Sequence, residues 1–299
     1  SYPAQATTQE ATHGLAAVTG YRGGNPSKAG QSFVDFLASW TCMTAILLGL
    51  RFRHRFGRGL WADVGMYQLG CFGVSEYVLD HVANAAPSER IGNRHRQYAP
   101  QGSYRCAGED AWCTLSVRDD DEWRALCRVI ERPELANDAR YASEAARRAQ
   151  HDAIDDIIGR WTATVSKIEA MERLQAAGVP AGAVLDGRDL NLDPQMNHRG
   201  LMEWVEFPEE RKMGGRRRII GRPWRFSKED LRVRGPAPTF GQHNQHVLRD
   251  ILGYDDERIA ALARDELIAG RRHVYESEMK DARRTKGRRH HENRPASHE

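Results

Sequence analysis

The sequence predicts an α/β protein with an open sheet in its first part, and two observations support this. A long apolar helical pattern at 36–50 is followed by a strand-like alternation at 61–66 and a second helical pattern at 68–85. Such alternation of helix and strand is typical of open α/β sheets. The chain also has 299 residues, of which 40% are hydrophobic and 28% charged, so it is long enough and apolar enough for two domains with cores of their own.

The first helix carries the strongest pattern in the chain. Large apolar side chains recur at the period of a helix, at Phe36, Trp40, Met43, Leu47 and Leu50. The other faces are also apolar or small, and helices of this kind are buried in a large core or in a membrane. Because the run is shorter than the roughly 20 residues that a bilayer requires, we expect a buried helix of a soluble protein.

Asp35 stands at the head of this helix, and two interpretations are open. It could cap the free N–H groups of the first turn, where the helix dipole favours a negative charge. Alternatively, it could be a nucleophile that the same dipole keeps ionised. At the other end, Gly57 fits a left-handed stop after a basic last turn that contains Arg51, Arg53, His54 and Arg55.

Several segments together resemble the class III CoA-transferases, the CaiB/BaiF family. In this sequence they are D-x-x-A-S at 35–39, RFRHRFGRG at 51–59, GNRHRQYAPQGSY at 92–104, ERPELANDARY at 131–141, AAGVPAG at 176–182, GRPWRFS at 221–227 and APTFGQHNQHVLRDILG at 237–253. Each segment is loosely defined by itself, but all of them occur in the order of the family. The resemblance extends over roughly residues 5–268.

The resemblance implies an open Rossmann-like larger domain with an inserted smaller α+β domain. Residues 1–88 and 185–268 would belong to the larger domain and 89–184 to the smaller one, while 269–299 is basic and predicted to be disordered. Family members form interlocked homodimers, so a homodimer is expected for the full-length protein. They also carry a further region before the part that this chain matches, which suggests that the chain is N-terminally short.

The resemblance also implies a reaction and its residues. Asp35 would attack an acyl-CoA thioester, giving an aspartyl anhydride and then an aspartyl-CoA thioester, from which a carboxylic acid acceptor collects CoA. Contacts to CoA are expected from Met66, Gly92, Asn93, Arg94, Tyr98 and Gly102. Arginines of the 92–102 loop could hold phosphates or a carboxylate, or the loop could simply be solvated.

Two alternatives to CoA transfer remain. One is an acyl-CoA racemase or isomerase of the same superfamily, whose members use a histidine upstream of the aspartate. His13 is the available histidine, but its position favours a structural role. The other is a non-catalytic fragment or partner subunit.

The rest of the chain predicts local elements. We expect a hairpin from 103–105 and 112–117, a strand at 200–207 with a basic hairpin tip near 214–215, and helices at 120–130, 144–161, 166–178, 241–252 and 256–267. The tryptophans of the middle third are expected in a core.

Charge and cysteine content restrict the partners. The net charge is only +3, which does not indicate a nucleic-acid or membrane partner. The five cysteines are odd in number and widely spaced, so neither a zinc site nor a disulfide framework is expected. We therefore predict a cytoplasmic enzyme without a metal or a tightly bound cofactor, whose substrates are acyl-CoA and a carboxylic acid.

Overall fold

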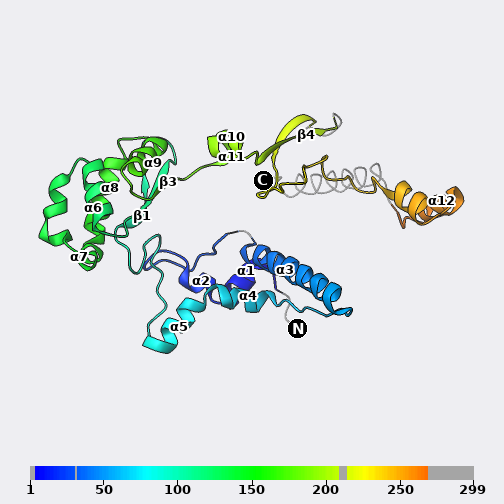
Figure 1. Ribbon diagram of the computed structural model, residues 1–299, viewed down its shortest axis with the longest axis horizontal. Coiled ribbons are helices and arrows are strands. Elements are labelled where there is room, and N and C mark those ends of the chain that lie inside the picture. The colour runs from blue at the N-terminus through cyan, green and yellow to red at the C-terminus, as the bar shows by residue number, and fades with distance from the viewer. Residues whose placement is uncertain (1–3, 31, 209–213, 269–299) are drawn as a thin grey trace, which may run out of the picture. The chain divides into compact units, whose positions relative to one another are not determined.

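The computed structural model describes residues 4–30, 32–208 and 214–268. Two compact units divide the chain, Ser1–Val184 and Leu185–Glu299, and each is considered by itself (Figure 1). The predicted disordered tail at 269–299 lies outside the described residues. The division into parts of a larger and a smaller domain stays a prediction.

The first unit begins with five helices. They are α1 (Ala6–Thr12), α2 (Leu15–Val18), α3 (Phe33–Phe56), α4 (Met66–Gly73) and α5 (Ser75–Asn84). The helix expected at 68–85 is therefore present, but it is interrupted at Val74. The strand expected at 61–66 is wrong, because 61–65 has no regular structure and Met66 already belongs to α4.

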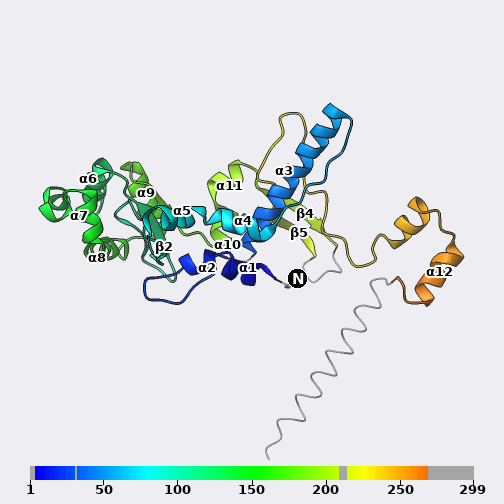
Figure 2. The same ribbon diagram turned by 90° about the horizontal axis from the view of Figure 1, so that it is seen from below.

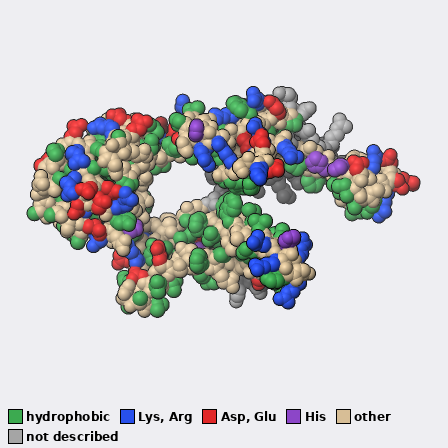
Figure 3. Space-filling view, viewed as in Figure 1, with side chains coloured by type: hydrophobic (Ala, Val, Ile, Leu, Met, Phe, Trp, Pro, Cys, Tyr) green, Lys and Arg blue, Asp and Glu red, His purple; other side chains and the backbone are tan. Residues whose placement is uncertain are grey.

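The prediction that the apolar helix is buried is also wrong. Val34 is the one buried residue of α3, whereas Phe36, Trp40 and Leu47 are exposed. Figure 3 shows hydrophobic side chains at the surface in the region of this helix. The helices that pack on α3 most extensively are α1, with 7 residues, and α4, with 8, and they are too short to cover a helix of 24 residues (Figure 2). With this length and composition, α3 is long and apolar enough to cross a membrane.

α4 packs closely against His13, the residue that follows α1. His13 is 5% exposed, and its ring lies directly against the backbone of Gly70. A Cβ atom placed on Gly70 would come 2.2 Å from Cδ2 of His13. Glycine is therefore required at this helical position by packing, and His13 has the structural surroundings that its sequence position suggests.

We expect Gly70→Ala to destabilise the protein. In an exposed helix the same change would stabilise by about 1 kcal/mol, but here the methyl group would overlap the buried His13 ring, at a cost of about 1–3 kcal/mol. The matched control is Gly73→Ala in the same helix, where no atom lies within 4 Å of the new Cβ. Urea unfolding of both variants checks the prediction, which fails if Gly70→Ala is as stable as the control.

A three-stranded antiparallel sheet and several helices form the second part of this unit. The strands, in the order β1-β2-β3, are β1 (Gln101–Arg105), β2 (Trp112–Ser116) and β3 (Ala181–Ala183). The predicted hairpin is confirmed, with Tyr104 opposite Cys113. The helices are α6 (Asp120–Val129), α7 (Glu144–Ala149), α8 (His151–Thr162) and α9 (Lys167–Ala176), with short 3-10 turns at Pro133–Asn137 and Ala139–Tyr141.

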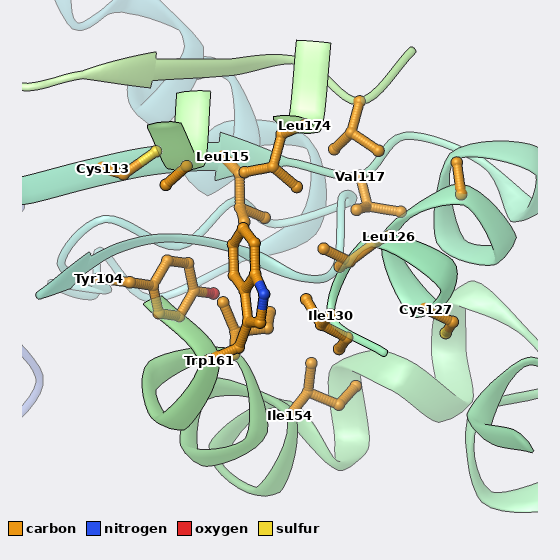
Figure 4. Packing of buried hydrophobic residues seen from close by; sticks show 14 of the residues in the cluster. Tyr104, Cys113, Leu115, Val117, Leu126, Cys127, Ile130, Ile154, Trp161 and Leu174 are labelled. Atoms are coloured by element: carbon orange, nitrogen blue, oxygen red, sulfur yellow. The ribbon is translucent and has the colours of Figure 1, made fainter. Parts of the chain in front are cut away.

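The hydrophobic core of the first unit lies between this sheet and these helices (Figure 4). Trp123 and Trp161 belong to it, which confirms the prediction of core tryptophans for these two, whereas Trp112 of β2 is only partly buried and lies outside the cluster. Cys113 and Cys127 are buried in the same cluster as free thiols. Burial raises the pKa of Cys113 to about 11 and that of Cys127 to about 12, so both thiols stay protonated at neutral pH.

The second unit is built around a two-stranded antiparallel hairpin, β4 (Met202–Phe207) and β5 (Gly215–Ile220). Part of its tip, residues 209–213, lies outside the described residues. The helices are α10 (Gly187–Leu192), α11 (Pro194–His198), a π-helix at His246–Ile251 and α12 (Asp256–Arg264). The molecule thus mixes helix and sheet as predicted. Both sheets of the described residues are antiparallel, and the open Rossmann-like arrangement stays a prediction.

Candidate functional site

Asp35 is the third residue of α3 and does not cap it. The N-cap position is occupied by Ser32, whose φ of 58° is left-handed and whose side chain makes no capping hydrogen bond. The interpretation of Asp35 as an N-cap is therefore wrong. Its Oδ2 atom is buried and has no hydrogen-bond partner among the described residues.

The side chain of Ser39 does not engage the Asp35 carboxylate. Ser39, one turn further along, directs its hydroxyl to the backbone carbonyl of Asp35 at 2.8 Å. Such back-bonding is common for serine within helices. Asp35 lies in the first turn, at the positive end of the helix dipole.

A pocket of about 590 Å³ lies beside the loop that precedes β1. Of the residues expected to contact CoA, Gly92, Asn93, Arg94 and Gly102 line it, and the facing side is formed by β2 and the start of β3. Tyr98 is not part of the lining, because its ring stacks on His95 with the ring centres 4.4 Å apart. Met66 and Asp35 do not line this pocket either; Met66 begins α4.

Arg94 is the one charged residue in the lining of this pocket, and acidic residues of α8 already hold its guanidinium. Its Nη2 atom pairs with Asp152 and lies 2.6 Å from Oδ2 of Asp155. The hydrogen bond from Arg94 keeps the pKa of Asp152 below its usual value. Two carboxylates therefore neutralise the charge that could otherwise have attracted a phosphate.

A buried network extends from the same carboxylates. The hydroxyl of Tyr104 donates to Oδ1 of Asp155 at 2.7 Å, and burial raises the pKa of this tyrosine well above its usual value. His151, one helical turn before Asp155, accepts the backbone N–H of Gln101 through Nε2 at 3.2 Å. Burial lowers the pKa of His151, which keeps its ring neutral and able to accept that bond.

Sequence reasoning missed this network and four polar residues that line the pocket, Gln101, Ser103, Thr114 and Ser116. His151 and Asp155 are spaced by four residues and so lie on one helical face, which was the available signal. The remaining polar lining consists of neutral amides and hydroxyls, namely Asn93, Gln101, Ser103, Thr114 and Ser116. A pocket with this lining suits a ligand segment that carries amides and no net charge.

The fold places the chain among proteins of known architecture. A CaiB/BaiF family protein from Brucella suis has a similar structure, with a TM-score of 0.71 and 23% sequence identity over 84% of this chain and 65% of that chain. This likeness concerns the fold alone.

Sequence comparison identifies the family. The model of CoA-transferase family III matches residues 1–244, and the chain belongs to this family, as its motifs indicate. It is similar to the succinyl-CoA–D-citramalate CoA-transferase of Chloroflexus aurantiacus (29% identity, 87% of this chain, 63% of the relative). It is also similar to the human succinyl-CoA:glutarate CoA-transferase (24% identity, 84% of this chain, 56% of the relative). The chain thus spans less than two thirds of the length of these relatives.

Proposed function

We propose that the protein to which this chain belongs transfers CoA from an acyl-CoA thioester to a carboxylic acid, with Asp35 as the nucleophile. One observation carries this proposal: a carboxylate in the first turn of α3 whose buried Oδ2 atom accepts no hydrogen bond from the described residues. Membership of CoA-transferase family III supports it. A carboxylate oxygen that no donor engages keeps its lone pairs for attack on a carbonyl carbon.

The proposed reaction conserves the activation of the thioester. Asp35 attacks the acyl carbonyl and expels CoA as a thiolate, which leaves an acyl-aspartyl anhydride. The thiolate then attacks the aspartyl carbonyl, releases the first carboxylic acid and forms an aspartyl-CoA thioester. An acceptor carboxylate attacks this thioester and displaces CoA, which takes the new acyl group from the second anhydride and frees Asp35. Water must be excluded because it would hydrolyse each intermediate.

We further propose that the pocket beside Gly92 receives an uncharged part of the thioester substrate. Its neutral lining matches the two amides of the pantetheine arm better than the phosphates of the nucleotide. Asn93 and Gln101 supply amide groups that can both donate and accept hydrogen bonds. CoA enters as a substrate, and the proposal includes no tightly bound cofactor.

Mass spectrometry tests the role of Asp35. The full-length protein is incubated with succinyl-CoA, the donor that the names of both relatives include, and is then digested. The peptide that contains Asp35 should gain the mass of CoA less one water molecule, and the adduct should disappear in Asp35→Asn. The control Asp63→Asn, at an exposed loop position, should retain it. Turnover without any adduct on this peptide would contradict the proposal.

We also propose that the full-length protein is a cytoplasmic homodimer in which α3 contributes to buried surface. Exposed apolar side chains on α3, among them Phe36, Trp40 and Leu47, support this because continuous apolar surface of this kind marks an interaction site. Sedimentation equilibrium checks the mass, and a monomer would contradict the proposal. Recovery in the membrane fraction would instead indicate that α3 contacts lipid.

A further inference from the structure

The loop at residues 20–30 precedes, in the chain, the helix that carries Asp35. Ser32, the N-cap residue of α3, has a left-handed backbone and makes no capping hydrogen bond with its side chain, while its carbonyl oxygen accepts the N–H of Phe36 at 3.2 Å. The buried side chain of Val34 holds this turn within the protein, and the contacts of the preceding loop hold the segment that leads up to it.

Glu10 of α1 holds the end of the loop nearest to Asp35. Its side chain is completely buried, and Oε2 accepts the backbone N–H of Ala29 at 2.9 Å. The other oxygen, Oε1, has no hydrogen-bond partner among the described residues. Burying a carboxylate completely costs free energy. The hydrogen bond that Glu10 makes connects α1 to the chain just before α3.

The other end of the loop is attached to the residues that line the pocket. The backbone N–H of Gly92 donates to the carbonyl of Gly20 at 2.8 Å, and the amide of Asn93 donates to the hydroxyl of Tyr21 at 3.3 Å. The ring of Tyr21 lies so close to Gly92 that a Cβ there would be 2.8 Å away from it. Arg90 adds two hydrogen bonds to the carbonyl of Gly24, at 2.9 and 3.2 Å.

We propose that Glu10 is a positioning residue for Asp35. The 20–30 loop is tied to the pocket at Gly92 and Asn93, and Glu10 secures its opposite end through Ala29. Together with the buried Val34, Glu10 therefore sets the position of the Asp35 carboxylate relative to a thioester held by the pocket. This inference rests on the proposed function. The position of Asp35 matters because a displacement of a reacting group by about 1 Å can lower the rate on the order of 100-fold.

The hydrogen bond between Glu10 and Ala29 allows a specific prediction. Ala29 requires only an acceptor, which the carbonyl oxygen of glutamine supplies as well as a carboxylate. Glu10→Leu should slow formation of the aspartyl-CoA adduct by roughly 10- to 100-fold and change the Kd for CoA by less than about threefold, because Glu10 does not line the pocket. Glu10→Gln should restore the rate to within a few-fold of the unmodified protein.

The experiment measures adduct formation by quenched-flow mass spectrometry, with CoA affinity measured separately by calorimetry. Gln9→Leu is the matched control, because Gln9 is the neighbouring residue of α1 and its Oε1 has no partner among the described residues. It should react at the rate of the unmodified protein. Hydrogen exchange at the Ala29 amide should accelerate in Glu10→Leu and return to normal in Glu10→Gln.

The outcomes separate this inference from the proposed function. A folded Glu10→Leu variant with an unchanged rate would overturn it, as would a Glu10→Gln variant as slow as Glu10→Leu. If Glu10→Leu does not fold, Ala29→Pro removes the donor N–H instead, and an unchanged rate in that variant would also overturn the inference. Absence of an adduct in the unmodified protein would refute the proposed function itself.

Discussion

Replacing Asp35 with alanine in the full-length protein is expected to abolish CoA transfer, lowering turnover by on the order of 10⁴-fold or more, because the variant lacks the atom that forms the bond to the acyl group. Affinity for CoA should stay within a few-fold, since the buried Oδ2 atom makes no hydrogen bond to the described residues that the alanine would break. Steady-state transfer from succinyl-CoA to a panel of carboxylic acids, together with CoA binding by calorimetry, measures both quantities.

Two comparisons make the result specific to the carboxylate. Asp35→Asn preserves the shape of the side chain and should be as inactive as alanine, whereas Asp63→Ala, at an exposed position, should transfer CoA normally. Unchanged turnover in Asp35→Ala would refute the proposed nucleophile. Solvent deuterium appearing next to the thioester carbonyl, without exchange of CoA between acids, would instead indicate a racemase or isomerase.

Elements with local determinants were predictable from the sequence. The helix α6 begins where Asp119 accepts the N–H of Glu122, and its apolar face, with Trp123 and Leu126, enters the core. Likewise α9 begins at Ser166, whose side chain accepts the N–H of Glu169. Caps and helical periodicity lie within a few residues of each other, so one stretch of sequence is enough to show them.

Elements that depend on distant parts of the chain were not predictable. Residues 61–65 alternate like a strand, but a strand needs a partner, and none is present among the described residues. The pattern of α3 correctly predicts a helix, whereas burial is decided by whatever covers it. The break between α7 and α8 at Gln150 likewise could not be predicted from hydrophobic periodicity, because the segments on both sides have helical sequences.

The candidate site divides in the same way. Asp35 and the loop at 92–102 are recognisable because they lie in motifs shared with the family. The partners of Arg94 come from α8, more than fifty residues further along the chain, and no local pattern connects them. The contact between Glu10 and Ala29 is also specified only by the folded chain.

Arg147 contributes to stability through contacts that no local sequence pattern predicts. This arginine of α7 is 1% exposed, and its guanidinium joins segments that are far apart in the sequence. It donates to the carbonyl oxygens of Ala99 at 3.0 Å and Tyr141 at 3.2 Å and pairs with Asp120 at 2.8 Å. It also lies over the ring of Trp123. Removing it leaves two carbonyl groups without these bonds in the interior.

We expect Arg147→Met to lower the free energy of unfolding by about 3–5 kcal/mol, because methionine fills much of the volume but satisfies none of these acceptors. Arg148→Met is the matched control: its guanidinium is partly exposed and pairs with Glu144, so the loss should be below about 1 kcal/mol. Urea unfolding followed by circular dichroism measures both. Equal stability of the two variants would show that the buried guanidinium contributes no more than a surface ion pair, because its desolvation then offsets its hydrogen bonds.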